Sequence, residues 1–151
     1  MSPKSLLIGL PLALAVACAD DVVAPSGGPV SIVIQQSLTG QTTSAGTFTM
    51  AGALTDQGAT TEELTFGGPL TQSPVPVTFR RTLSGANGTI VVVGKATLTF
   101  TSPTAATLAG TWEVESGTGV YAKGRGTLTG SANFGATPPT AALTYAGSLT
   151  R

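Results

Sequence analysis

Three polar side chains interrupt apolar patterns in a way that could place them inside a folded domain. Gln36, Glu62 and Arg81 each hold a position of an alternating pattern that is otherwise occupied by large apolar residues. A lone buried charge is costly, and Glu62 is the only acid on the same face as Arg81. If these side chains point inward, they could orient a ligand in an apolar pocket. The alternative is a position at a barrel rim, where a bulge or a strand end exposes them.

The sequence offers little else for catalysis or metal binding. It contains no histidine, which removes the commonest general base and the commonest transition-metal ligand. Glu113 and Glu115 have the spacing of a carboxylate pair, but they share a face with Thr and Ser, so we expect them in solvent. We therefore expect no metal and no cofactor, and we assign no catalytic residue. The formal net charge of zero gives no support for nucleic-acid binding.

Glycine is concentrated in residues 116–130, SGTGVYAKGRGTLTG. A dinucleotide-binding loop would need Gly-x-Gly-x-x-Gly between a strand and a helix, but the spacing from Gly119 to Gly124 is wrong. The residues that follow alternate like a strand, so no helix N-terminus is available to hold a phosphate. We interpret Gly117 and Gly119 as turn residues with positive φ. Gly124 and Gly126 are interpreted as points where a strand bends or another backbone approaches.

The N-terminal segment is typical of an export signal. In residues 1–17, Lys4 precedes an apolar run of about 12 residues, which is too short for a bilayer that takes about 20. The run ends in Ala-Val-Ala before Cys18 and resembles a bacterial lipoprotein signal, in which the mature chain begins with a lipid-modified cysteine. The resemblance implies an exported protein that is attached to a membrane through a lipid on Cys18. Its expected location is the outer membrane, the periplasm or the cell surface. Residues 18–30 then form a lipid anchor and flexible linker rich in Gly and Pro.

The remaining residues, 31–151, alternate with a period of two, which is typical of strands. Eight segments show the alternation: residues 31–38, 46–54, 62–66, 76–83, 88–100, 107–115, 125–134 and 141–149. The even spacing of these eight segments predicts an all-β domain. We expect an eight-stranded antiparallel calycin-like barrel, whose interior is filled by side chains or holds one small ligand. Closure also removes sheet edges, which a chain with only 9% charged residues would protect poorly.

Turn residues divide these strands. Asn87-Gly88 is a strong hairpin signal, and Asp56-Gln57-Gly58 and Ser116-Gly117 are further expected turns. Gly94 lies inside the segment 88–100 and predicts a kink in one long strand.

Residues 110–130, GTWEVESGTGVYAKGRGTLTG, resemble the barrel superfamily of allene oxide cyclases and dirigent proteins and their bacterial relatives. Those proteins carry a strand, Gly-Thr-Gly or Gly-Ser-Gly, a small or aromatic residue, and then Gly-x-Gly at the start of the next strand. In this chain the pattern is matched by Gly117-Thr118-Gly119, Tyr121, Gly124 and Gly126. The resemblance covers roughly residues 85–150 and implies an antiparallel barrel. Its matching residues are architectural, so no catalytic residue is transferred.

These observations favour an exported lipoprotein whose small barrel is a binding or structural module for a hydrophobic small molecule at the cell envelope. Tyr121, next to Lys123 at a barrel mouth, could gate the pocket or pack over the barrel end. The alternative is a cyclase- or dirigent-like enzyme that uses the lumen to fold a substrate. A transmembrane barrel with its apolar face outward is a third alternative, which the single Trp and two Tyr disfavour.

Overall fold

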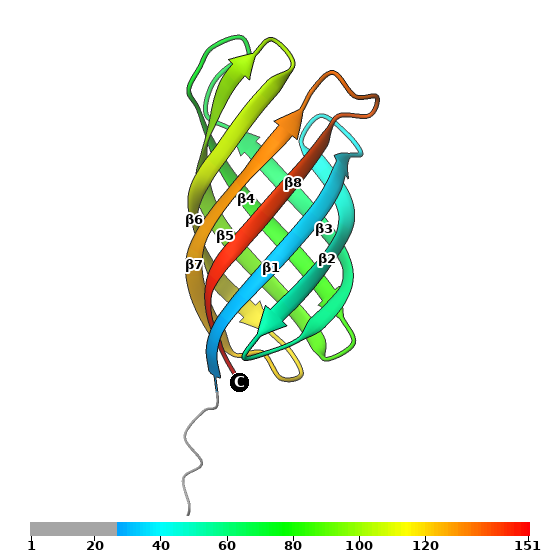
Figure 1. Ribbon diagram of the computed structural model, residues 1–151, viewed down its shortest axis with the longest axis vertical. Helices are drawn as coiled ribbons and strands as arrows, with labels where there is room; N and C mark the ends of the chain where they lie inside the picture. Colours follow the sequence, from blue (N-terminus) through cyan, green and yellow to red (C-terminus); the bar gives the residue numbers. More distant parts are fainter. Residues whose placement is uncertain (1–26) are drawn as a thin grey trace, which may run out of the picture.

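The computed structural model describes residues 27–151, which form a closed barrel of eight antiparallel strands (Figure 1). The strands are β1 (Gly27–Leu38), β2 (Thr43–Gly52), β3 (Asp56–Phe66), β4 (Val75–Gly85), β5 (Gly88–Ser102), β6 (Ala105–Gly117), β7 (Lys123–Asn133) and β8 (Thr140–Thr150). Each strand pairs with the next, and β8 pairs with β1. The predicted fold class is therefore confirmed. Residues 27–151 include no helix with the length and apolar character needed to cross a membrane.

The start of the barrel lies earlier than predicted. β1 begins at Gly27 rather than at residue 31, because Gly27 and Pro29 already pair with Thr150 and Ser148 of β8. The predicted signal peptide, Cys18 and the linker up to residue 26 lie outside the described residues.

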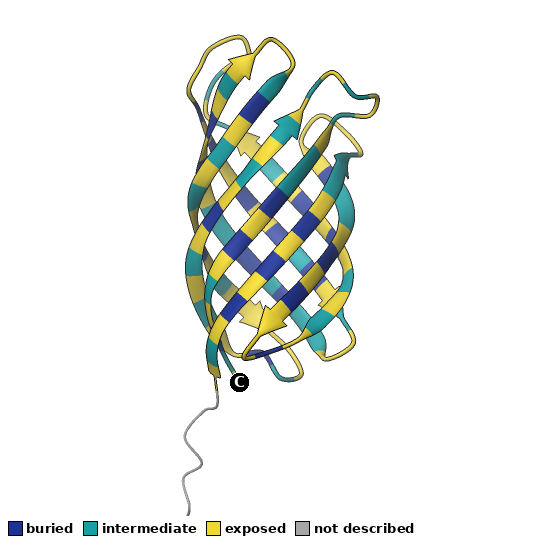
Figure 2. Ribbon diagram, in the orientation of Figure 1, coloured by how far each residue is buried: buried dark blue, intermediate teal, exposed yellow. Residues whose placement is uncertain are grey.

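Burial follows the predicted alternation (Figure 2). In β4, the side chains of Val75, Val77, Phe79, Arg81 and Leu83 are buried and alternate with more exposed neighbours. The large apolar side chains thus point into the lumen, while the outer positions are mainly Thr, Ser and Ala. A transmembrane barrel carries an apolar band on its outer face, which is the reverse of this arrangement.

Two large rings occupy the lumen beside a glycine. Gly94 of β5 pairs with Phe79 on one side and with Trp112 on the other. A Cβ atom at Gly94 would collide with the ring of Phe79 and with the carbonyl oxygen of Thr111. Glycine is therefore required here for close approach. β5 runs unbroken through Gly94, which confirms the predicted single long strand, and its pairing with β6 shifts at Val91/Val92 and at Phe100/Ser102. The kink at Gly94 stays a prediction.

The two ends of the barrel carry different connections. The lower end in Figure 1 carries the first and last described residues, Gly27 and Arg151. It also carries three connections, namely 53–55, 86–87 and 118–122. The other four connections lie at the upper end, namely 39–42, 67–74, 103–104 and 134–139. Two expected turns are wrong, because Asp56 begins β3 and Gly117 ends β6. The turn between β2 and β3 instead follows Gly52, whose φ is 117°.

Candidate ligand-binding site

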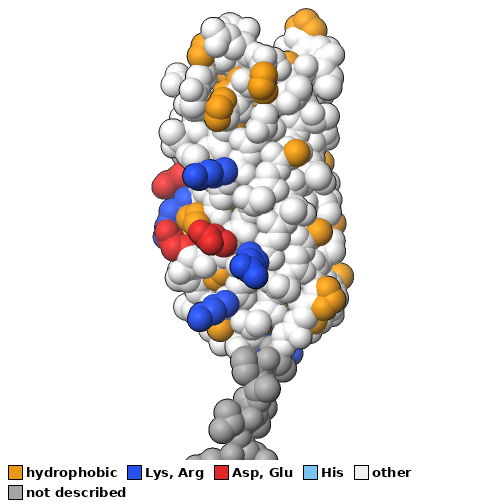
Figure 3. Space-filling model, turned by 90° about the vertical axis from the view of Figure 1, so that its left-hand side faces the viewer, with side chains coloured by type: hydrophobic (Ala, Val, Ile, Leu, Met, Phe, Trp, Pro, Cys, Tyr) orange, Lys and Arg blue, Asp and Glu red, His pale blue; other side chains and the backbone are white. Residues whose placement is uncertain are grey.

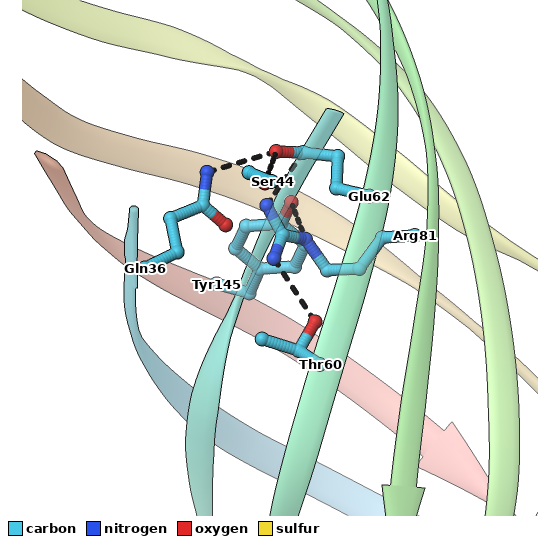
Figure 4. Close-up of polar contacts among 6 residues, drawn as sticks. All are labelled: Gln36, Ser44, Thr60, Glu62, Arg81 and Tyr145. Atoms are coloured by element: carbon cyan, nitrogen blue, oxygen red, sulfur yellow. Dashed lines mark hydrogen bonds and ion pairs between the residues drawn. The ribbon is translucent and has the colours of Figure 1, made fainter. Parts of the chain in front are cut away.

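A cluster of six polar side chains lies inside the barrel (Figure 4). We call it the polar floor; its members are Gln36, Ser44, Thr60, Glu62, Arg81 and Tyr145. The floor draws on β1, β2, β3, β4 and β8. Glu62 and Arg81 are directly paired across β3 and β4, so their side chains leave the sheet on the same face.

Arg81 is the centre of the floor and is fully buried. Its Nη2 lies 2.5 Å from Oε1 of Glu62. Nη1 donates to Oγ1 of Thr60 at 3.1 Å, and Nε donates to the hydroxyl of Tyr145 at 3.1 Å. The Nη2 contact is an ion pair without hydrogen-bond geometry. Each nitrogen of the guanidinium is thus engaged by another floor residue.

Glu62 has two further partners on its second oxygen. Oε2 accepts from Nε2 of Gln36 at 2.8 Å and from Oγ of Ser44 at 3.0 Å. The side chain of Glu62 is 3% exposed. A buried ion pair is tolerated when hydrogen bonds satisfy its remaining atoms. Residues of three further strands, β1, β2 and β8, form hydrogen bonds with this pair.

Two polar atoms of the floor lack a hydrogen bond: Nη2 of Arg81, which is nevertheless ion-paired with Glu62, and Oε1 of Gln36, which has no partner. An ionised carboxylate only accepts hydrogen bonds, so Gln36 must turn its amide nitrogen toward Glu62. That orientation fixes Oε1 on the opposite side of the amide. Oε1 is buried and accepts no hydrogen bond. An unpaired buried acceptor is a position where a ligand or a water with a free hydrogen would be stabilised.

Above the floor, the lumen contains a chamber of about 60 Å³. Gln36, Glu62 and Tyr145 contribute to its lining. Its apolar wall includes five side chains that are only half-buried, namely Leu38, Leu64, Phe66, Leu108 and Phe134. All five come from the upper halves of their strands or from the upper connections. The chamber is therefore apolar, has a polar base and lies toward the upper end of the barrel.

Tyr145 joins the chamber to the packed core beneath it. Its ring stacks on Trp112 with centroids 5.9 Å apart, and Trp112 in turn donates from Nε1 to the carbonyl of Thr127 at 3.0 Å. Burial raises the pKa of Tyr145 to about 12, although the charge of Arg81 opposes the shift. The hydroxyl is protonated at neutral pH, as it is at the ordinary pKa of 10, so it can donate or accept a hydrogen bond.

Tyr121 lies at the other end of the molecule. It is buried at the lower end, where its hydroxyl donates to Oδ2 of Asp56 at 2.6 Å. Asp56 also accepts from the backbone N–H groups of Gln57, Ala86 and Asn87. Tyr121 is not part of the chamber lining. It packs over the lower end and ties three connections together there.

The glycine cluster has an architectural role. Gly119 has a φ of 66° in the β6–β7 connection, as interpreted from the sequence. Gly117 does not have positive φ; a Cβ there would lie 2.5 Å from the carbonyl oxygen of Tyr121. Gly124 and Gly126 lie in β7, where the backbone of β8 leaves no room for a side chain.

The remaining charges lie mainly on the outside of β4 to β7, where Figure 3 shows them gathered on one side of the barrel. Arg80 and Glu115 form an ion pair of 2.7 Å there, with side chains 51% and 43% exposed. Glu113 is paired with Arg125 across β6 and β7. Within residues 27–151, no three His, Cys, Asp or Glu side chains are grouped as metal ligands would be.

Three floor residues are not among those predicted from the sequence. Thr60 precedes Glu62 by two residues, so the alternation itself places both on one face. Ser44 occupies the inward pattern of Phe48 and Met50 and could have been found in the same way. Tyr145 shares the inward face of Leu143 and Leu149, so the alternation places its side chain inside, but its contact with Arg81 depends on the closure of the barrel.

No family model, curated protein or solved structure matches the chain. The resemblance to the allene oxide cyclase and dirigent barrels therefore stays a prediction. The fold and the site define a small closed antiparallel barrel with an apolar chamber above a buried polar floor.

Proposed function

We propose that the protein is an exported lipoprotein whose barrel binds a small hydrophobic molecule in the chamber. The observation that carries the proposal is the asymmetry of the lumen. Below the polar floor, the interior is filled by buried side chains such as Trp112, Leu83 and Ile90. Above it, Phe66, Phe134 and neighbouring apolar side chains are half-buried around the chamber. Covering apolar surface is favourable, so a ligand in the chamber would stabilise the upper end.

The size of the chamber restricts the ligand. About 60 Å³ is less than half of the roughly 150 Å³ cavity that admits benzene. A drug-sized site has several hundred Å³. We therefore propose a slim, unbranched apolar molecule that enters between the half-buried side chains of the mouth.

The position of the chamber agrees with an anchor at Cys18. The described chain enters the barrel at Gly27, at the lower end, whereas the chamber lies toward the upper end. Cys18 lies nine residues before Gly27. A lipid on Cys18 would thus hold the lower end near the membrane and leave the mouth facing the opposite direction, toward soluble donors of the ligand.

Binding fits the floor better than catalysis does. Arg81, Glu62 and Thr60 are engaged with one another, and the hydroxyl of Tyr145 keeps its proton at neutral pH. A cyclase-like enzyme that only folds a reactive substrate needs few acid–base groups, so this alternative is kept as an outcome of the test. Conversion of a bound molecule, in place of reversible binding, would favour it.

Two substitutions at neighbouring positions test the binding proposal. Ala141 lines the chamber, whereas Ala142 is the next residue of β8 and faces outward. In the full chain carrying Cys18→Ser, medium-chain aliphatic molecules at about ten times their Kd should raise Tm by roughly 5 °C. Ala141→Leu should abolish this shift by filling the chamber, and Ala142→Leu should preserve it. An unchanged shift in Ala141→Leu would place the ligand elsewhere.

The anchor is tested separately in cells. The natural chain should fractionate with membranes, and Cys18→Ser should release it from them. Recovery of both forms in the same fraction would contradict the lipoprotein proposal without affecting the binding test.

A further inference from the structure

We infer that the ligand of the chamber ends in a neutral hydrogen-bond donor, such as a hydroxyl group, and inserts that end first. The inference rests on the proposed function, because it specifies the molecule that the chamber would hold. It follows from the unpaired oxygen of Gln36, from the absence of available cationic donors in the chamber lining within residues 27–151, and from the charge of Glu62.

The unpaired oxygen sets the main requirement. Gln36 lines the chamber, and its amide nitrogen is committed to Glu62. Its Oε1 is buried without a partner. Leaving a buried acceptor unpaired is unfavourable, whereas an O–H or N–H group brought to it forms a new bond in a low-dielectric site. A ligand with a donor end thus gains an interaction that a plain hydrocarbon cannot make.

Tyr145 favours a hydroxyl among the possible donors. It also lines the chamber, and its oxygen already accepts from Nε of Arg81. A phenol both donates and accepts, so its own proton can be offered to a ligand oxygen. A hydroxyl group can accept this proton while it donates to Gln36, but an ether oxygen can only accept.

The charges of the floor disfavour an ionic end. Glu62 lines the chamber, while Arg81 is fully buried and is not part of the lining. A ligand carboxylate would therefore approach a like charge, and the three guanidinium nitrogens already have partners. An ammonium group would be attracted to Glu62 but would lose its hydration beside a pair that is already neutral. A neutral donor avoids both penalties.

Three ligands of similar length separate these contributions: 1-octanol, its isomer methyl heptyl ether, and octanoate. The full chain carrying Cys18→Ser should bind 1-octanol about five- to tenfold more tightly than the ether, the ratio expected for one additional buried hydrogen bond. Octanoate should bind more weakly than 1-octanol. Calorimetric titration gives the three Kd values directly.

A matched pair of variants assigns the preference to Gln36. Gln36→Met keeps the length of the side chain but removes Oε1, and should reduce the ratio between the ether and the alcohol to about one. Ser44→Ala also removes one hydrogen bond to Oε2 of Glu62, but Ser44 is not in the chamber lining. It should retain the preference for 1-octanol.

The outcomes separate the two proposals. If none of the three ligands binds, the proposed function falls. If they bind but the ether or octanoate binds as tightly as 1-octanol, only the inference about the donor end is overturned. A preference that persists in Gln36→Met would overturn the assignment to Gln36. Should Gln36→Met fail to fold, the ratio measured in the chain with Gln36 intact still decides whether a donor is preferred.

Discussion

Nη2 of Arg81 lies 2.5 Å from Oε1 of Glu62 in the interior of the barrel, where the two side chains are 0% and 3% exposed. The preceding residue in β4, Arg80, makes an ion pair of similar length with Glu115 on the outside. Two adjacent arginines thus form the same contact in opposite environments. The inner pair holds the polar floor beneath the chamber, and the outer pair is exchangeable with water. Their different burial allows the contribution of the floor to stability to be measured within one strand.

Arg81→Met should destabilise the barrel by about 3–5 kcal/mol, because it leaves the carboxylate of Glu62 buried without its counter-charge. Arg80→Met should change stability by no more than ~1 kcal/mol, since its pair is exposed and screened. Urea unfolding followed by circular dichroism measures both. The double variant Arg81→Met/Glu62→Leu should regain most of the loss, because it removes both charges together. Equal effects of the two single variants would contradict a structural role for the inner pair.

Asp56 should make the protein sensitive to acid. Burial tends to raise the pKa of Asp56, but the hydrogen bonds from Tyr121 and from three backbone N–H groups hold it below the ordinary value of 3.8. A carboxyl whose pKa is lowered by folding stabilises the folded state above that ordinary value, and this stabilisation is lost as pH falls through the folded value. Stability of the natural barrel should therefore decline below about pH 4.

The variant Asp56→Asn should show a flatter stability profile in this range, as measured by urea unfolding at a series of pH values. Tyr121→Phe removes one of the bonds that lower the pKa, so the folded and unfolded values lie closer together and the variant should lose less stability on acidification than the natural chain. Glu63→Gln, at an exposed position of the same strand, is the control and should leave the profile unchanged. Parallel profiles for Asp56→Asn and the natural chain would refute the assignment.

The fold could be predicted because one local pattern repeats in every strand. Burial of the inward positions is the main favourable term, and in β4 this pattern is unbroken from Val75 to Leu83. Strand ends were less predictable. Asp56-Gln57-Gly58 has the composition of a turn, but Gly58 pairs with Gly85 and the carboxylate of Asp56 caps the neighbouring hairpin. Long-range strand pairing decides the conformation of these three residues. Their local turn propensity carries no information about that pairing.

The site was predictable where two residues share an alternating face and have complementary charges, as Glu62 and Arg81 do. The chamber could not be predicted, because its volume depends on how side chains from seven strands pack together. The location of Tyr121 follows from the topology alone. In an antiparallel meander, the second, fourth and sixth connections lie at one end, so Tyr121 lies at the lower end with Asp56 and not at the upper end with the chamber.

The two tyrosines should resist ionisation in the folded protein. Burial raises the pKa of Tyr145 to about 12, and burial together with the bond to Asp56 raises that of Tyr121 further above its ordinary value of 10. These are the only tyrosines in the chain. At about pH 10.5, free tyrosine is roughly three-quarters ionised. Tyrosinate absorbance of the folded barrel should therefore be small at this pH and should increase sharply when urea unfolds it.

The same shifts predict a loss of stability in alkali. A group whose pKa is raised by folding stabilises the folded state below the ordinary pKa, and this contribution decreases as pH rises toward the folded value. The midpoint of urea unfolding should thus fall as pH increases from 10 toward about 12. Full tyrosinate absorbance in a barrel that retains its circular dichroism would show that the hydroxyl groups are accessible.

Gly94 should be intolerant of any side chain, although it has no unusual φ. A Cβ atom there would meet the carbonyl oxygen of Thr111 and the ring of Phe79, and neither can move away without disturbing the strand pairs of β5. Overpacking of this kind typically costs about 1–3 kcal/mol. Gly94→Ala should therefore lower the free energy of unfolding by at least that amount, and it should perturb Trp112, which is paired with Gly94 on the other side.

Gly68 provides the matched control, because no atom lies within 4 Å of a Cβ built there. Gly68→Ala should change the free energy of unfolding by less than about 0.5 kcal/mol. Urea unfolding gives the two values, and the emission of Trp112, the single tryptophan, reports on the lumen in the same samples. The emission should shift to longer wavelength in Gly94→Ala as water gains access to the indole, and remain unchanged in Gly68→Ala. If both variants match the natural chain, the ring of Phe79 does not lie against the backbone of β5, and the packing of Phe79 and Trp112 in the lumen differs from that described.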